Sequence, residues 1–306
     1  MVGISHVHYV LGDYKPLTEI PEMDTSKENL AKFRINGVRQ YCGSDKTMYQ
    51  LALETATATL EKSGLDRSSV GAVFFATGNH HCKELHEEDF AGRLLDELGL
   101  GSAFFYGVFM QYCASVAAAL QLAGQFAEAN GTNVLLVSAD KILDYGPIVR
   151  IIPGVIGLHS DGAVSCIVTG RNPQFTMTPF QTLQDSSSWR LMYGQEKKGL
   201  QDSFLTNSRL VISRVLEANN LPKESIHHVV TNNFNFTISK NLSVYWEIPY
   251  EKFFSLNIPR TAHCPAGDVF INLLDMKTAG IISRGDSILT FFPAPHSWMG
   301  TLLTKN

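Results

Sequence analysis

The chain has 306 residues, of which 44% are hydrophobic and 18% charged, so it is long enough to bury one large core or two closely packed ones. Its formal net charge of −4 gives no overall basic field, and we expect no nucleic-acid partner. No apolar run reaches the roughly 20 residues that span a bilayer, and no secretory leader opens the chain. The sequence therefore predicts a cytoplasmic protein without a membrane partner.

Helical and strand patterns alternate along the chain, which predicts an α/β fold. In the first half we expect a helix over residues 47–63, where apolar side chains recur at helical spacing and Gly64 follows as a stop. A buried strand is expected over 70–77. A second helix is expected over 117–129, and a second strand over 133–138.

The same order of patterns recurs in the second half. Residues 211–218 and 269–282 have helical patterns, whereas 226–231 and 287–292 have strand patterns. Two such units in the same order and at nearly the same spacing suggest a duplicated α/β half. The matching strands should superpose and lie at the centres of two stacked sheets, because their apolar runs are nearly continuous. The alternative is chance similarity of generic helix-to-strand units.

Cys113 is the cysteine placed best for covalent chemistry. The five cysteines are an odd number at irregular spacings without a C-x-x-C pair, which argues against a disulfide framework and a structural zinc site. Cys113 follows a β-rich run and precedes an Ala-rich helical run, so its thiol should lie near a helix N-terminus that favours the thiolate. This placement suits a covalent nucleophile. The alternative is a small buried core cysteine.

A second group of possible metal ligands lies in a polar segment directly after the first predicted strand. It consists of His80, His81, Cys82 and His86. Neighbouring histidines point in different directions, and the spacing matches no closed zinc site. We therefore interpret this segment as a loop at a pocket mouth and predict no metal and no cofactor.

Short motifs in a fixed order extend over nearly the whole chain. They are Asn36-Gly37-Val38-Arg39, Gln111-Tyr112-Cys113-Ala114-Ser115, Ser160-Asp161-Gly162-Ala163-Val164, Asn232-Asn233-Phe234-Asn235, Arg260-Thr261-Ala262-His263 and Trp298-Met299-Gly300. On these motifs the chain resembles the thiolase superfamily and, within it, the β-ketoacyl-acyl-carrier-protein synthase III (KAS III) group. The resemblance implies a duplicated, five-layered α-β-α-β-α fold, with one half over residues 1–170 and the other over 171–306. It also implies a homodimer that uses acyl-CoA or acyl carrier protein as substrate.

The resemblance further implies a catalytic set. Cys113 matches the nucleophile that carries the acyl group in this family. Asn232 stands where the family has its catalytic histidine, and His263 stands where it has its catalytic asparagine, so the pair is swapped. Both side chains can donate hydrogen bonds to the enolate oxygen that forms when a malonyl thioester loses carbon dioxide. Equally, His263 can serve as a general base for an alcohol or amine acceptor.

Three further residues are candidates for the substrate pocket. His296 lies in a proline-containing stretch that replaces the family's Gly-rich loop, and Tyr112 replaces a small residue next to the thiol. Asn79 stands where an HMG-CoA-synthase-like enzyme would carry a glutamate, which argues against that reaction. For His296 the alternative is a packing histidine near the chain end.

These features predict a KAS III-like acyltransferase that forms an acyl thioester on Cys113. The acyl group then passes by condensation to a malonyl-type thioester, or to an oxygen or nitrogen acceptor, in specialised polyketide or fatty-acid-like metabolism. The alternative is a non-catalytic partner subunit of a KAS III-like heterodimer. The presence of Cys113 favours the enzyme.

Overall fold

The computed structural model describes residues 1–87, 89–142, 149–188, 190, 199–265 and 267–306. The strands of these residues are β1 (Gly3–Leu11), β2 (Asp13–Pro16), β3 (Gln40–Gly43), β4 (Val70–Ala76), β5 (Phe104–Val108), β6 (Asn133–Asp140), β7 (Gly162–Thr169), β8 (Phe175–Met177), β9 (Gln181–Gln184), β10 (His228–Val230), β11 (Ser287–Pro293) and β12 (Ser297–Lys305). Their α-helices are α1 (Lys27–Ile35), α2 (Met48–Ser63), α3 (Glu84–Glu87), α4 (Phe90–Glu97), α5 (Ser115–Asn130), α7 (Leu200–Ala218), α8 (Phe236–Trp246), α9 (Ile258–Thr261) and α10 (Asp268–Thr278).

Both halves of the chain have the same connectivity. In the first half β4 and β6 are parallel, and β7 returns antiparallel to β6 and pairs with β1. In the second half β10 and β11 are parallel, and β12 returns antiparallel to β11 and pairs with β8. The helices α5 and α10 occupy matching positions before β6 and β11. The duplication predicted from the sequence is therefore confirmed, whereas the boundary at residue 170 stays a prediction.

The fold differs from the sequence expectation in how the two sheets meet. Within the described residues, ten strands form a single sheet in the order β10-β11-β12-β8-β1-β7-β6-β4-β5, with β9 paired to β12 outside this path. The short strand β8 joins the halves because it pairs with β1 on one side and with β12 on the other. The two stacked sheets that the sequence predicts are therefore joined edge to edge through β8.

The second-half strand around Val229 is also placed differently from the expectation. β10 is three residues long and lies at the edge of the sheet, whereas its counterpart β4 lies between β5 and β6. A single bridge between Val229 and Phe253 covers the outer side of β10. The predicted helix over 269–282 ends early, at Thr278, because Gly280 adopts a left-handed φ of 68°.

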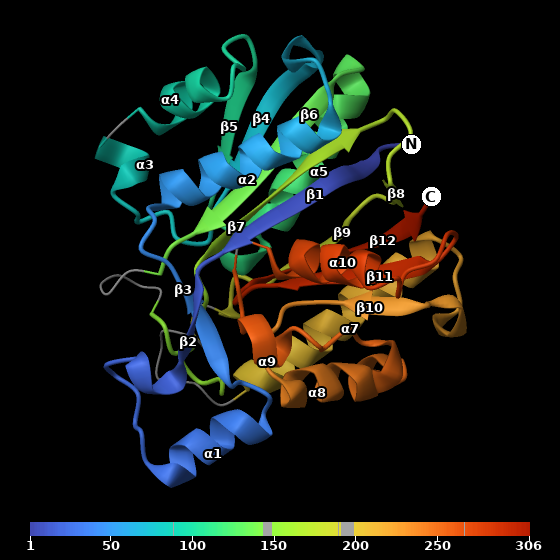
Figure 1. Ribbon diagram of the computed structural model, residues 1–306. Coiled ribbons are helices and arrows are strands. Elements are labelled where there is room, and N and C mark those ends of the chain that lie inside the picture. The colour runs from blue at the N-terminus through green and yellow to red at the C-terminus, as the bar shows by residue number, and fades with distance from the viewer. Residues whose placement is uncertain (88, 143–148, 189, 191–198, 266) are drawn as a thin grey trace.

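Helices cover both faces of the sheet in each half (Figure 1). In β6, Leu136 faces a central cluster shared with α5 and α10, whereas Leu135 packs against α2 on the opposite face. In β11, Ile288 faces the same central cluster, and Leu289 packs against α7 and α8. The layers are therefore α2, sheet, α5 with α10, sheet, and α7 with α8, as the five-layered prediction requires. Burial on both faces explains the continuous apolar runs.

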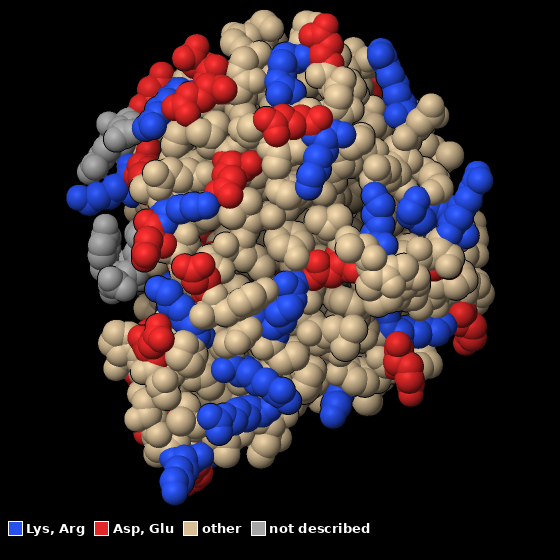
Figure 2. All heavy atoms as spheres, in the orientation of Figure 1, with Lys and Arg blue, Asp and Glu red and all other residues tan. Residues whose placement is uncertain are grey.

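The surface is mixed in charge and shows no membrane-spanning helix in the described part of the chain. Figure 2 shows Lys and Arg interspersed with Asp and Glu over the face in view. None of the described helices combines the length and the apolar composition that crossing a membrane requires.

Candidate active site

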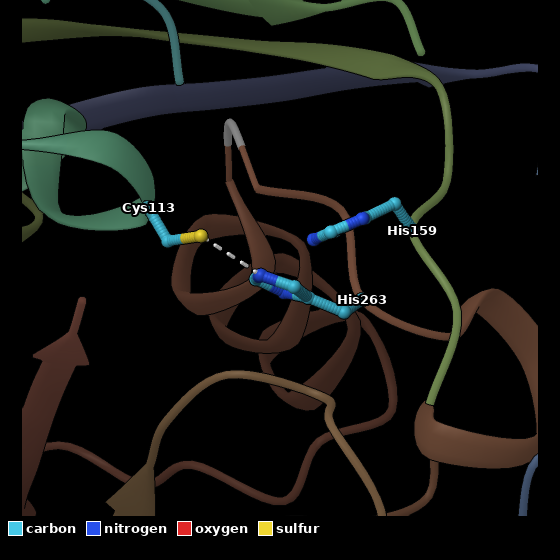
Figure 3. A group of neighbouring side chains, drawn as sticks. All are labelled: Cys113, His159 and His263. Atoms are coloured by element: carbon cyan, nitrogen blue, oxygen red, sulfur yellow. Dashed lines mark hydrogen bonds between the residues drawn. The ribbon is translucent and has the colours of Figure 1, made fainter. Parts of the chain in front are cut away.

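Cys113 and His263 meet where the two halves face each other. Cys113 lies in a short 3-10 turn, Tyr112–Ala114, directly before α5, and His263 lies in the loop before α10. The distance from Cys113 Sγ to His263 Nε2 is 3.2 Å, and Figure 3 shows the two groups pointing toward each other. Tyr112 holds a left-handed φ of 48°, a strained conformation of the kind that clusters at functional sites.

Asp268 orients the imidazole of His263 from the side opposite the thiol. The distance from His263 Nδ1 to Asp268 Oδ2 is 2.5 Å, and both side chains are fully buried. A carboxylate only accepts hydrogen bonds, so Nδ1 carries a proton and Nε2 faces the sulfur of Cys113. This arrangement is a nucleophile, a base and an orienting acid in line.

The carboxylate of Asp268 is itself held by neutral donors. The backbone N–H of Asn233 donates to it at 2.7 Å, and that of Cys264 donates at 2.9 Å. The side-chain amide of Asn233 donates a further bond at 3.2 Å and accepts one from Asn272 at 3.0 Å. Asp268 also stands in the first turn of α10, where the helix dipole favours a negative charge. The acid is thus fixed before any substrate binds.

The pKa of His263 reflects these two partners. Burial by itself lowers this pKa, but Cys113 and Asp268 outweigh burial and raise it to about 10. At neutral pH the imidazole therefore keeps both protons and presents a charged N–H to the sulfur of Cys113. Phe234 packs against this imidazole with ring centroids 4.4 Å apart, which keeps it in place.

His159 is a third side chain at this point, and Figure 3 shows its ring extending toward the other two. The sulfur of Cys113 and one ring nitrogen each of His159 and His263 lie within 4.8 Å of one another. His159 Nδ1 lies 2.6 Å from the carbonyl oxygen of Val149 and donates to it. Burial, followed by the charge of His263, lowers the pKa of His159 to about 3, so this imidazole is neutral.

These three residues are also of the types that bind zinc, and they form the group that could hold an ion among the described residues. The His80 segment is arranged differently. There the Nε2 of His86 lies 2.9 Å from the carbonyl oxygen of His80, and the ring of His80 packs against that of His81.

Asn232 was expected to face Cys113 together with His263. Its buried side-chain amide donates to the carbonyl oxygen of Pro293 at 3.4 Å. The structure instead connects the next residue, Asn233, to the relay through Asp268. A role of Asn232 at the reacting atoms stays a prediction.

Two of the three pocket candidates contact each other at the turn that carries Cys113. The rings of Tyr112 and His296 meet edge to face with centroids 5.5 Å apart, and His296 also bonds the amide of Gln184. Asn79 is buried, and its side chain donates to the carbonyl oxygen of Lys141 at 2.8 Å. Contacts of these three residues with substrate stay predictions.

The sequence motifs did not single out Asp268, Asn233 or His159. A signal existed for Asp268, because it is the acidic residue that opens the helix after His263. For His159 the signal was weaker, since it stands directly before the Ser160-Asp161-Gly162 motif. Asn233 lies in a motif in which the resemblance assigns a role to the first residue, Asn232.

Comparisons with known proteins agree with the fold and the predicted resemblance. No profile of a known protein family matches the chain. The chain is 24% identical to β-ketoacyl-[acyl-carrier-protein] synthase III of Pseudomonas aeruginosa over 94% of this chain and 93% of that protein. A further match, to synthase III 1 of Streptomyces coelicolor, has 25% identity over 44% of this chain and 40% of that protein.

Solved structures match over nearly the full length. An acyltransferase named ChlB3 has a TM-score of 0.88 at 15% identity, over 99% of this chain and 97% of that chain. The 3-oxoacyl-[acyl-carrier-protein] synthase III of Aquifex aeolicus has a TM-score of 0.83 at 19% identity, over 99% of this chain and 100% of that chain. The chain therefore has the thiolase fold and resembles KAS III, which confirms both predictions.

Proposed function

We propose that this KAS III-like chain is an acyltransferase that forms an acyl thioester on Cys113 and passes the acyl group to a second substrate. The observation that carries the proposal is the contact series from Cys113 through His263 to Asp268. It provides the nucleophile, the proton carrier and the orienting acid that acyl transfer requires. A coenzyme A or carrier-protein thioester is the donor that the resemblance implies.

In the proposed loading step, Cys113 reacts as the thiolate beside the protonated imidazole of His263. The thiolate of Cys113 attacks the carbonyl carbon of the donor thioester, and a new carbon–sulfur bond forms. The bond to the donor sulfur breaks, and the leaving thiolate takes the proton from His263 Nε2. His263 is then neutral, with its Nδ1 proton still donated to Asp268.

For the second step the contacts support transfer to oxygen or nitrogen more than condensation. A neutral imidazole backed by a carboxylate readily takes up the proton of an alcohol or amine. Condensation calls for two donors aimed at an enolate oxygen, and the amide of Asn232 donates to Pro293. Placement in specialised metabolism, a homodimer and a cytoplasmic location are parts of the same proposal. The relay supports an active enzyme over a non-catalytic partner subunit.

Intact-mass analysis tests the loading step. Purified protein is incubated with acetyl-CoA, butyryl-CoA or malonyl-CoA, and the mass added to the chain is measured. We expect an acyl adduct on the unmodified chain and on Cys82→Ala, a control that removes a buried cysteine. We expect none on Cys113→Ala. An adduct that persists on Cys113→Ala, or a folded wild-type chain that takes up none of the three groups, overturns the proposal.

A further inference from the structure

His159 is a buried imidazole beside the reacting pair, and the proposed relay of Cys113, His263 and Asp268 does not use it. We propose that His159 Nε2 accepts a hydrogen bond from the acceptor substrate, which therefore presents two neighbouring donor groups, as a vicinal diol or a primary amine does. This inference rests on the proposed acyltransferase function and names the class of its second substrate. A carbon nucleophile of the malonyl type does not fit this assignment.

The tautomer of His159 is fixed by its other nitrogen. Nδ1 lies 2.6 Å from the carbonyl oxygen of Val149, which only accepts, so the single proton of the neutral ring sits on Nδ1. The Nε2 lone pair is left to accept, and among the described residues no partner occupies it. A ligand that covers this atom has to supply a donor, because an acceptor that loses water without gaining a hydrogen bond is costly.

The position of His159 is fixed by the backbone. The N–H of Ser160 donates to the carbonyl oxygen of His263 at 2.7 Å, and the N–H of His263 donates to that of Leu158 at 3.0 Å. This pairing brings the two imidazoles to a centroid distance of 5.4 Å. A small group held between them lies next to an acyl group on Cys113, because all three side chains converge within 4.8 Å.

The charge state of His159 opposes condensation. Burial and the charge of His263 lower the pKa of His159, so the ring stays neutral and Nε2 does not become a donor at physiological pH. The developing enolate of a malonyl group needs donors. A lone pair aimed at the same region repels that oxygen, whereas it attracts an O–H or N–H group.

The transfer step then uses both imidazoles in different ways. The acceptor oxygen or nitrogen attacks the carbonyl carbon of the thioester on Cys113, and its proton passes to His263 Nε2. The carbon–sulfur bond breaks, and the sulfur leaves as the thiolate beside the new imidazolium. His159 gains no proton, because it holds the neighbouring O–H or the second N–H of the acceptor in place.

The test separates loading from transfer. Wild type, His159→Phe and His159→Gln are loaded with acetyl-CoA, freed of donor, and mixed with propane-1,2-diol, glycinamide or propan-1-ol, while deacylation is followed by intact mass. The phenyl ring keeps a flat side chain without a lone pair, and the glutamine amide keeps an acceptor oxygen. Thermal melting of all three proteins checks that each is folded.

We expect wild type to deacylate faster with the diol or with the amine than with propan-1-ol. Comparison of the diol and the amine shows which of these two acceptors the enzyme uses. His159→Phe should load at the wild-type rate within about twofold but lose that preference by about tenfold, the worth of roughly one hydrogen bond. His159→Gln should restore part of it. An unchanged acceptor preference in His159→Phe overturns this inference alone. So does a loading rate that falls by the same factor as the transfer rate. Absence of any adduct on wild type overturns the proposed function as well.

Discussion

In each half of the molecule, the turn after the first parallel strand donates hydrogen bonds to a buried carboxylate. The two carboxylates, Asp140 and Asp268, differ in their other partners. In the first half, Asp140 Oδ1 accepts bonds from the hydroxyl of Thr77 at 2.7 Å and from the backbone N–H groups of Gly78 and Asn79 at 2.9 Å. In the second half, Asp268 binds the backbone N–H of Asn233 in the equivalent turn.

The difference is the imidazole. Asp268 also accepts a hydrogen bond from Nδ1 of His263, and Nε2 of the same ring faces Cys113. Asp140 has neutral donors, and burial raises its pKa to about 6 despite the bonds from Thr77, Asn79 and Gly78. The carboxylate of Asp140 therefore only holds its turn in place. The carboxylate of Asp268 holds the equivalent turn and also binds the imidazole of His263.

Replacing the imidazole should have the largest effect. We expect His263→Asn to slow the loading of Cys113 by about 10²–10⁴-fold at pH 7, because no group then holds the thiol proton. The rate of acyl adduct formation measures this change. His228→Asn, which removes a histidine paired with Asp286 near the surface, serves as the control and should load normally. Loading near the wild-type rate in His263→Asn would exclude this residue from the relay.

Exchanging the two carboxylates for amides sharpens the comparison directly. In Asp268→Asn, His263 loses the carboxylate that orients its ring and helps to raise its pKa, so less of the imidazole carries the second proton and we expect loading to fall by about 100-fold. Asp140→Asn should load within about threefold of wild type, since the amide oxygen can accept the same bonds as Oδ1. Equal losses in both variants would mean that Asp268, too, acts structurally.

The pH dependence of stability should identify Asp140 as the strained carboxylate. Folding raises its pKa from 3.8 to about 6, so its contribution to stability is full below 3.8 and is lost as pH rises toward 6. Compared with Asp140→Asn, wild type should therefore gain about 2 kcal/mol in the free energy of unfolding between pH 7.5 and pH 4.5. Denaturant unfolding at the two pH values measures this. A difference that is constant with pH contradicts the assignment.

The smallest effect is expected at the pocket edge. His296→Ala removes an edge-to-face contact with Tyr112, next to the nucleophile, and a bond with Gln184. Because neither contact reaches the reacting atoms, we expect loading to fall by only about two- to fivefold. Comparison of loading rates for acetyl-CoA and butyryl-CoA shows whether the loss depends on acyl size. A loss as large as that of His263→Asn would place His296 in the relay.

Much of the fold could be predicted from the sequence because its signals are local. The helix over 47–63 agrees with α2 to one residue, since Thr47 and Gln50 form a capping box and Gly64 ends the helix. The edge position of β10 could not be predicted, because it depends on which strands of a distant half continue the sheet.

The nucleophile and the base of the site could be predicted from the sequence. The residues that surround and orient them, His159 and Asp268, could not. Cys113 and His263 follow from the element pattern and the resemblance, and the structure brings them together. His159 reaches them only through backbone pairing between segments far apart in the chain. Asp268 depends on a loop that folds back on its own helix start, a geometry that periodicity does not encode.

The most direct test of the central claim, that His263 holds the proton of Cys113, is the pH dependence of thiol alkylation. Iodoacetamide modification is followed by intact mass from pH 5.5 to 9.5 in wild type and His263→Asn, and the other four cysteines are buried. Because a protonated His263 beside the sulfur favours the thiolate, wild type should react faster than the variant at and below neutral pH. The variant should react slowly until pH approaches about 8.5, as a free thiol does. A wild-type profile that coincides with that of the variant contradicts the account.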